Sequence, residues 1–316
     1  MEKWNNALQF TGERMSRSFE LQGHRGARGL FPENTLAGFG AAMALGVSSL
    51  ELDVVMTADD ILAVVHDPEL NPDLTRGPDN NWLAPPGPAV RSLRWDELAL
   101  FDVGAARPGG AVAQANPAQQ SLERARIPSL EQVLDLVAGR VVIDIELKTD
   151  PNRPKLSPPP AKMAEAVVAL ARRRGGLDHL AIRSFDWRGL IHLRAHRPEI
   201  PLGWLTAPNT ANATWRGEFV RPDLSIPASV ALASGGNRRD CWAPFFGELN
   251  PNLIAEAHAL GLRVVPWTVN APGDMARLIS WGVDGLCTDR PDIARQIIAE
   301  AGLDLPPPCA EMICQN

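Results

Sequence analysis

The 316-residue sequence has no apolar run long enough to cross a lipid bilayer. Its first 19 residues, MEKWNNALQFTGERMSRSF, also lack the apolar core of a secretion signal. We therefore expect no stable membrane insertion and, for the sequence as written, a cytoplasmic protein. A periplasmic or secreted location is the alternative if a leader peptide has been removed.

The sequence also lacks a surplus of basic residues. Its 31 Lys and Arg side chains are outnumbered by 37 Asp and Glu, which gives a formal net charge of −6. A nucleic-acid-binding protein needs positive charge to neutralise phosphates, so nucleic acid is excluded as a partner. An acidic protein can still bind a small anionic substrate if it holds a metal ion locally.

Cysteine is scarce, with four residues in the whole chain. This number and their spacing exclude a disulfide scaffold and a cysteine zinc site. Cys241 and Cys287 lie in apolar segments and are expected to be buried free thiols. Cys309 and Cys314 would pair only in an oxidising compartment, and the sequence leaves that pairing open.

From residue 19 to residue 302, short apolar segments alternate with amphipathic ones, which is the pattern of a parallel sheet covered by helices. Strands are predicted at 20–24, 49–55, 141–148, 180–185, 201–206, 240–245, 263–269 and 283–289, and helices at 34–46, 129–139, 160–175, 187–198, 250–261 and 272–282. Eight strands predict an irregular (β/α)8 TIM barrel over residues 19–302, with flexible tails at 1–18 and 303–316.

One connection breaks the alternation. The segments 51–56 and 61–67 are separated only by TADD, which is too short for a helical crossover and predicts a hairpin. Its register places His66 opposite Glu51, within two residues. Residues 68–127 then form an insertion rich in Pro, Gly, Ala and Asn, with one helical stretch at 92–104. The sequence leaves open whether this insertion covers the site or has no part in it.

Local signals mark several helix starts. Ser129 and Gln132 form a predicted capping box, and Asn34 and Asn250 are expected N-caps. The segment 210–240 looks long and irregular where a helix would normally follow a strand. This segment leaves the outer wall of the site undefined.

Charged residues stand inside or at the ends of otherwise apolar strands. Because side chains alternate along a strand, Glu51 and Asp53 share one side, as do Glu146 and Lys148. The carboxyl ends of barrel strands carry catalytic residues, so these groups and His24 should meet there. Buried carboxylates need a partner, and three of them favour a bound divalent cation, Mg²⁺ or Ca²⁺. The alternative is an internal salt-bridge network of Glu51, Asp53, Glu146, Lys148 and Arg25.

Taken in order and spacing, seven motifs over residues 20–300 resemble the glycerophosphodiester phosphodiesterase family. They are GHRGARGLFPENT, ELDVVMTADDILAVVHD, IPSLEQVL, IELK, SFDW, PWTVN and GVDGLCTDRPD. The resemblance implies a metal-dependent hydrolase of diesters such as glycerophosphocholine. It assigns acid–base catalysis to His24 and His66, the metal to Glu51, Asp53 and Glu146, the phosphate to Arg25 and Lys148, and a pocket wall to Trp267. Phe185, which ends its strand, is a further candidate for that wall.

Two alternatives remain open. A related barrel could cleave a lysophospholipid or sphingomyelin, for which exposed apolar residues in the insertion would provide a groove. A barrel that only binds phosphodiesters is the other, although both histidines and all three carboxylates are present. The sequence does not determine which alcohol leaves, which histidine is the acid, or the oligomeric state.

Overall fold

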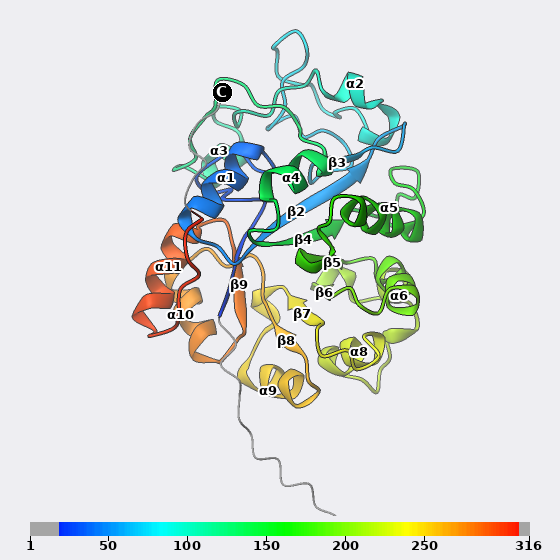
Figure 1. Ribbon diagram of the computed structural model, residues 1–316, viewed down its shortest axis with the longest axis vertical. Coiled ribbons are helices and arrows are strands. Elements are labelled where there is room, and N and C mark those ends of the chain that lie inside the picture. Colours follow the sequence, from blue (N-terminus) through cyan, green and yellow to red (C-terminus); the bar gives the residue numbers. More distant parts are fainter. Residues whose placement is uncertain (1–18, 310–316) are drawn as a thin grey trace, which may run out of the picture.

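The computed structural model describes residues 19–309 and contains a barrel of eight parallel strands with helices outside it (Figure 1). The barrel strands are β1 (Glu20–Gly23), β2 (Ser49–Met56), β4 (Val142–Leu147), β5 (Leu180–Ser184), β6 (Leu202–Thr206), β7 (Cys241–Pro244), β8 (Arg263–Val264) and β9 (Gly285–Thr288). Neighbours pair in the order β8-β7-β6-β5-β4-β2-β1-β9. The predicted TIM barrel is confirmed.

The two ends of this sheet meet, so the barrel closes. Beyond β8 the chain stays extended, and backbone hydrogen bonds run from Val269 to Cys287 and from Cys287 to Pro266. A further bond from Asp284 to Val264 completes the seam. Of the predicted strand 263–269, only β8 is regular β-structure. The residues after β8 bond to β9 through this irregular seam.

The predicted hairpin is also confirmed. β3 (Leu62–Val64) pairs antiparallel with β2, with Val54 opposite Val64 and Met56 opposite Leu62. Continued by the bond from Val65 N to Asp53 O, at 3.1 Å, this register places His66 beside Leu52. That is one residue from the predicted partner Glu51 and within the stated range.

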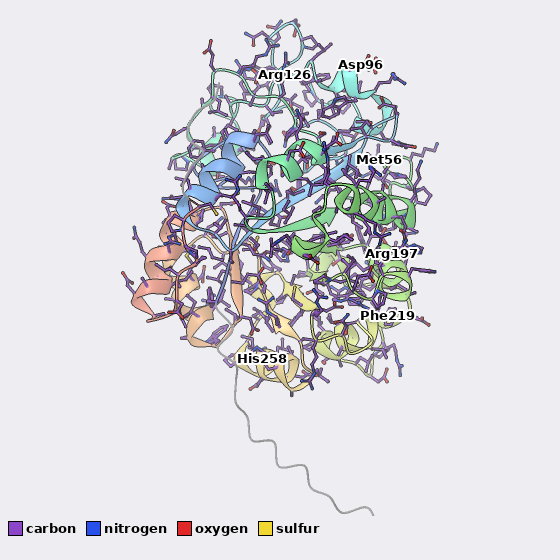
Figure 2. All side chains as sticks on the ribbon, viewed as in Figure 1. Met56, Asp96, Arg126, Arg197, Phe219 and His258 are labelled. Atoms are coloured by element: carbon purple, nitrogen blue, oxygen red, sulfur yellow. The ribbon has the colours of Figure 1, made fainter. Side chains whose placement is uncertain are left out.

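Helices cover the outer face of the barrel, and side chains fill the layer between (Figures 1 and 2). They are α1 (Leu36–Leu45), α4 (Leu130–Val137), α5 (Pro160–Arg173), α6 (Trp187–His196), α8 (Ile226–Ala233), α9 (Pro251–Ala259), α10 (Pro272–Ser280) and α11 (Pro291–Glu300). Because the core lies on one side of β2 and the barrel interior on the other, the whole of β2 is buried.

Two predictions about helices need correction. The segment 210–240 is not irregular throughout: after the short α7 (Ala213–Arg216), Ser225 caps the regular helix α8. The N-cap of α1 is Thr35, whose hydroxyl accepts from Gly38 N, and not Asn34. Asn34 takes a left-handed conformation (φ 54°) and turns its amide toward Asp53 instead. The Ser129–Gln132 capping box and the Asn250 cap are confirmed.

The insertion 68–127 folds into an irregular layer at one end of the molecule, where Figure 2 labels Asp96 and Arg126, far from His258 on α9. It holds the short helices α2 (Trp95–Leu98) and α3 (Ala111–Ala115), so the helix predicted at 92–104 is a single turn. A small separate core joins it to the hairpin, built from Val55, Ala63, Leu70, Val90, Leu98, Phe101 and Ile127. The insertion is therefore packed on the hairpin that carries His66.

Residues 303–309 return to the barrel, where Cys309 N donates to Met43 O at 3.0 Å. Cys287 is buried and Cys241 partly buried, both as free thiols. The expected N-terminal tail 1–18 and Cys314 lie outside the described residues. Across residues 19–309, no helix combines the length and apolarity needed to cross a membrane.

Candidate active site

Three carboxylates meet at the carboxyl ends of adjacent strands. Glu51 and Asp53 come from β2, and Glu146 comes from β4, where it is the register partner of Asp53. Each offers an oxygen within 4.8 Å of the others, and all three residues are buried. The predicted cluster therefore exists as a set of converging side chains.

Two cations border this cluster. Lys148 Nζ lies 2.7 Å from Glu146 Oε1 and 3.6 Å from Asp53 Oδ1. Arg25 Nε lies 3.3 Å from Asp53 Oδ2, while its Nη1 donates to Glu33 at 2.8 Å. Lys148 and Arg25 thus make contacts of the predicted salt-bridge network. These contacts do not provide a hydrogen bond for every oxygen of the three carboxylates.

The pKa values of Asp53 and Glu51 are shifted in opposite directions. Burial acts to raise the pKa of Asp53, but the charges of His66, Arg25 and Lys148 outweigh it and hold that pKa well below the usual range. Burial and then the charge of Asp53 raise the pKa of Glu51. Within residues 19–309, Glu51 receives one hydrogen bond, from Arg25 N at 3.0 Å.

The donor set fits a hard divalent cation. Asp53 Oδ1 is buried and accepts no hydrogen bond from the described residues, which is costly for a carboxylate oxygen. When all three carboxylates are ionised, the two bordering cations Lys148 and Arg25 leave one negative charge unbalanced. Carboxylate oxygens are the ligands that Mg²⁺ and Ca²⁺ prefer.

His24 is held at the end of β1 by a residue from the opposite end of the chain. Its Nδ1 lies 2.6 Å from Oδ1 of Asp289, and Asn270 donates to Oδ2 of Asp289 at 2.7 Å. Because the carboxylate accepts, Nδ1 carries the proton and Nε2, which faces Glu51 at 3.9 Å, is left to exchange one. Burial lowers the pKa of His24, with Asp289 opposing that shift.

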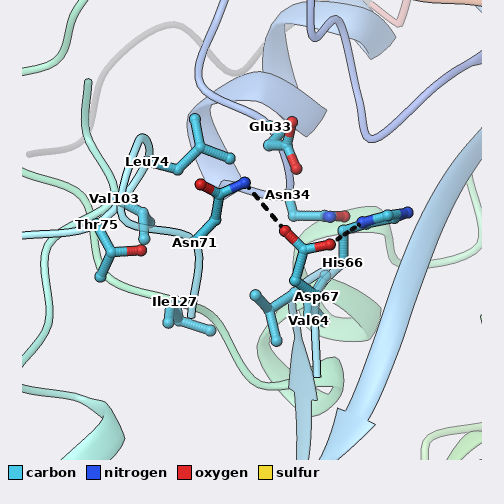
Figure 3. A pocket seen from close by; sticks show the side chains of 11 residues that line it. Glu33, Asn34, Val64, His66, Asp67, Asn71, Leu74, Thr75, Val103 and Ile127 are labelled. Carbon is cyan, nitrogen blue, oxygen red and sulfur yellow. Dashed lines mark hydrogen bonds and ion pairs between the residues drawn. The ribbon is translucent and has the colours of Figure 1, made fainter. Parts of the chain in front are cut away.

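His66 follows β3 and has a similar arrangement (Figure 3). Its Nδ1 lies 2.6 Å from Oδ1 of Asp67, and Asn71 donates to Oδ2 of Asp67 at 3.1 Å. A small pocket beside it is lined by residues of the barrel and of the insertion, among them Glu33, Asn34, Val64, Leu74 and Ile127. His66 thus lies where the hairpin, the insertion and the loop of residues 24–34 meet.

The first loop, residues 24–34, is shaped by left-handed backbone. Arg25 has φ 48° and Gly26 has φ 90°, and a Cβ on Gly26 would lie 2.8 Å from the backbone of Gly38. Glycine is therefore required there for the loop to lie against α1. This turn brings the Arg25 side chain back toward Asp53.

Aromatic rings stand at the carboxyl ends of more distant strands. Phe185, after β5, meets Trp267 edge to face with centroids 5.3 Å apart. Phe245, after β7, lies 5.7 Å from Trp267, and all three rings are partly exposed. Sequence reasoning selected Phe185 and Trp267 but missed Phe245.

Polar residues beside the histidines were largely missed from the sequence. Asp67 directly follows His66, and Asn270 ends the quoted PWTVN motif, yet neither received a role. Asp289, within the quoted GVDGLCTDRPD motif, binds His24, the chain neighbour of Arg25. Asp144 lies deeper in β4 and pairs with Arg183, and it is not one of the three converging carboxylates.

The chain is similar in sequence to proteins of one enzyme family. The model of the glycerophosphoryl diester phosphodiesterase family matches residues 24–293. A glycerophosphodiester phosphodiesterase of Bacillus altitudinis is 29% identical over 280 residues, which is 88% of this chain and 97% of that protein. One from Caldanaerobacter subterraneus subsp. tengcongensis is 26% identical over 282 residues, covering 88% and 97%.

Solved structures of other proteins have the same fold as this chain. A protein of Silicibacter pomeroyi DSS-3, named for the same activity, superposes with a TM-score of 0.82 at 36% identity, covering 92% of this chain and 96% of that one. An Oleispira antarctica phosphodiesterase, in complex with the product sn-glycerol-3-phosphate, gives a TM-score of 0.65 at 20% identity, with 89% and 97% covered.

Proposed function

The chain belongs to the glycerophosphoryl diester phosphodiesterase family, and from this membership we propose a specific reaction and site. The protein is an enzyme of the phosphodiesterase class. Its proposed reaction is the hydrolysis of small glycerophosphodiesters, such as glycerophosphocholine or glycerophosphoethanolamine, to sn-glycerol 3-phosphate and an alcohol. The proposed machinery is a divalent cation and two histidines.

The observation that carries the proposal is the convergence of three buried carboxylates beside a histidine whose Nε2 faces them. Glu51, Asp53 and Glu146 would hold the cation, Mg²⁺ or Ca²⁺. When bound, such a cation supplies positive charge that stabilises the negative phosphoryl oxygens. Buried carboxylates in a packed core would otherwise reduce stability, which supports a function for them.

Arg25 and Lys148 supply the fixed positive charge of the chain itself. Both are largely buried, and burial acts to lower each pKa, but the neighbouring carboxylates raise the pKa of Arg25 and of Lys148 above the ordinary values. Both groups therefore remain cationic at neutral pH. In this proposal they bind the phosphate and stabilise the charge that develops on it.

His24 and His66 are the proposed acid–base pair. In each, Nδ1 is occupied by an aspartate, so Nε2 is the atom that takes or gives a proton. One histidine removes the proton of the attacking hydroxyl, from water or from the glycerol group, and the other protonates the departing alkoxide. The aromatic residues Phe185 and Trp267 would form one wall of the substrate pocket.

A lipid substrate is less well supported. An acyl chain needs an exposed apolar groove, and within residues 68–127, all of them described, Leu100 is the one large hydrophobic side chain classed as exposed. The insertion therefore favours small polar diesters. A barrel that binds without catalysis remains the alternative for an inactive protein.

The test is release of glycerol 3-phosphate from glycerophosphocholine after treatment with EDTA and after restoring Mg²⁺ or Ca²⁺. We expect activity to vanish with the chelator and to return with one of the two cations. Activity that persists in excess EDTA would contradict the metal site. Turnover of lysophosphatidylcholine alone would support the lipid alternative, and silence with every diester would support the binding barrel.

A further inference from the structure

Asn71, near the start of the insertion, is linked to His66 indirectly, through Asp67. Its Nδ2 donates to Oδ2 of Asp67 at 3.1 Å, and the other carboxylate oxygen of Asp67 lies 2.6 Å from Nδ1 of His66. Figure 3 shows Asp67 between the amide of Asn71 and the imidazole. One residue of the insertion is thus connected to His66 by two consecutive hydrogen bonds.

The orientation of the Asn71 amide is determined by a third contact. Its Oδ1 accepts from the backbone N–H of Asp73 at 2.9 Å, so the NH₂ group must face Asp67. Asp73 is itself anchored, because its side chain accepts from Ala111 N and its carbonyl accepts from Arg107 N. The folded insertion therefore holds the amide in place.

We propose that Asn71 is a positioning residue, which acts through Asp67 to fix the ring orientation and tautomer of His66. This inference rests on the proposed function, in which His66 exchanges a proton with the substrate. It assigns the insertion a part in catalysis: the layer packed on the hairpin keeps one histidine in its working geometry.

The need for such a residue follows from exposure. The side chains of His24 and Asp289 are 11% and 7% exposed, whereas those of His66 and Asp67 are 30% and 36% exposed. Water competes for the carboxylate of Asp67, so a donor on its second oxygen is needed to keep the first on His66. Asn270 provides the equivalent donor for Asp289, from an unrelated part of the chain.

The electrostatics of Asp67 agree with this role. Burial acts to raise the pKa of Asp67, but hydrogen bonds from His66 and Asn71 outweigh it and hold that pKa below the ordinary value. An ionised Asp67 accepts from both neighbours at once, and it keeps the proton of His66 on Nδ1.

Two substitutions separate positioning from local structure. Asn71→Ala removes the contacts with Asp67 and Asp73, whereas Asn71→Asp keeps an acceptor for Asp73 N and replaces the donor to Asp67 by a carboxylate oxygen that repels it. We expect kcat to fall about tenfold in both variants, with KM within about twofold, since a misplaced catalytic group affects the reaction step. Wild-type kcat in Asn71→Asp would overturn the proposal, because it would leave Asn71 only a role in the turn.

The matched control is Asn81→Ala. Asn81 lies in the same insertion and also donates to an aspartate, Asp79, at 2.9 Å, but it is exposed and makes no contact with His66. It should retain wild-type kcat. Its loss of activity to the same extent would overturn the proposal by showing that any weakening of the insertion suffices.

A double-mutant cycle tests the route through Asp67. If Asn71 acts through Asp67, then Asp67→Ala and Asp67→Ala/Asn71→Ala should have the same kcat, and fully additive losses would overturn that route. His66→Ala distinguishes failure of the proposed acid–base role of His66 from failure of the positioning role of Asn71. Wild-type turnover in His66→Ala removes the proposed acid–base role, whereas an inactive His66→Ala with unimpaired Asn71 variants removes only the present inference.

Discussion

Nδ1 of His24 lies 2.6 Å from Oδ1 of Asp289, although the two residues are 265 positions apart in the chain. β1 and β9 pair directly, with Gly23 opposite Thr288, so closing the barrel brings the first and last strand ends together. The orientation of His24 thus depends on the closure itself. Asp289 is buried, and its pKa is lowered because the His24 contacts and Arg28 outweigh the effect of burial.

The first prediction concerns Asp289→Asn. The amide nitrogen can donate to Nδ1 and so favour the wrong tautomer of His24. We expect kcat to fall by at least about 10²-fold with little change in KM, as for other orienting aspartates of catalytic histidines. Asp292→Asn, three residues further along the chain, half-buried and paired with Arg290, should behave as wild type. Near-normal kcat in Asp289→Asn would contradict the orienting role.

The second prediction concerns the histidines themselves. His24→Ala and His66→Ala should each reduce kcat by at least about 10²-fold, because each removes one proton transfer. Thermal unfolding should show that both variants keep the fold. His196→Ala, on the exposed end of α6, serves as the control. Turnover close to wild type in either site variant would refute that residue's assignment.

The third prediction concerns cation binding without reference to activity. Titration calorimetry with Mg²⁺ and with Ca²⁺ should detect one site in the wild-type protein. Glu51→Gln and Asp53→Asn should weaken that binding by at least about tenfold, since each loses an anionic ligand. Glu131→Gln on the outer surface should leave it unchanged. Equal affinities in all four proteins would place the cation elsewhere.

The fourth prediction concerns stability and pH. At the opposite end of the barrel, Glu20 pairs with Arg263; burial acts to raise the pKa of Glu20, but the contact with Arg263 and other hydrogen bonds lower it overall. A carboxylate whose folded-state pKa is depressed stabilises the protein above its unfolded pKa, about 4.3, and that stability is lost as pH falls toward the folded value.

Arg263→Met should therefore lower Tm at pH 7, and its difference from wild type should shrink as pH falls below about 4. Thermal unfolding monitored by circular dichroism from pH 3 to pH 7 measures this. Glu20→Gln/Arg263→Met should show a smaller pH dependence than wild type. A difference that stays constant over the whole range would mean that Glu20 does not contribute through its charge.

Much of the site could be predicted from the sequence because it depends on local rules. Alternation along a strand placed Glu51 beside Asp53, and a four-residue connection required the hairpin that returns His66 to the strand end. The position of Asn34 was misjudged for a local reason as well. An asparagine before a helix is a common cap, but Thr35 took that position while the Asn34 amide bonded to Asp53.

What the sequence by itself determined is the order of elements and the identity of the chemical groups, since periodicity and turn signals act over a few residues. Only the tertiary structure decided that Asp289 holds His24, and how the donor to Asp67 is oriented. The pair of His24 with Asp289 needs a closed barrel. Asn71 lies only four residues from Asp67, but its amide is oriented by Asp73, which accepts from Arg107 N and Ala111 N across the folded insertion. Such contacts depend on packing between distant segments, which no local pattern specifies.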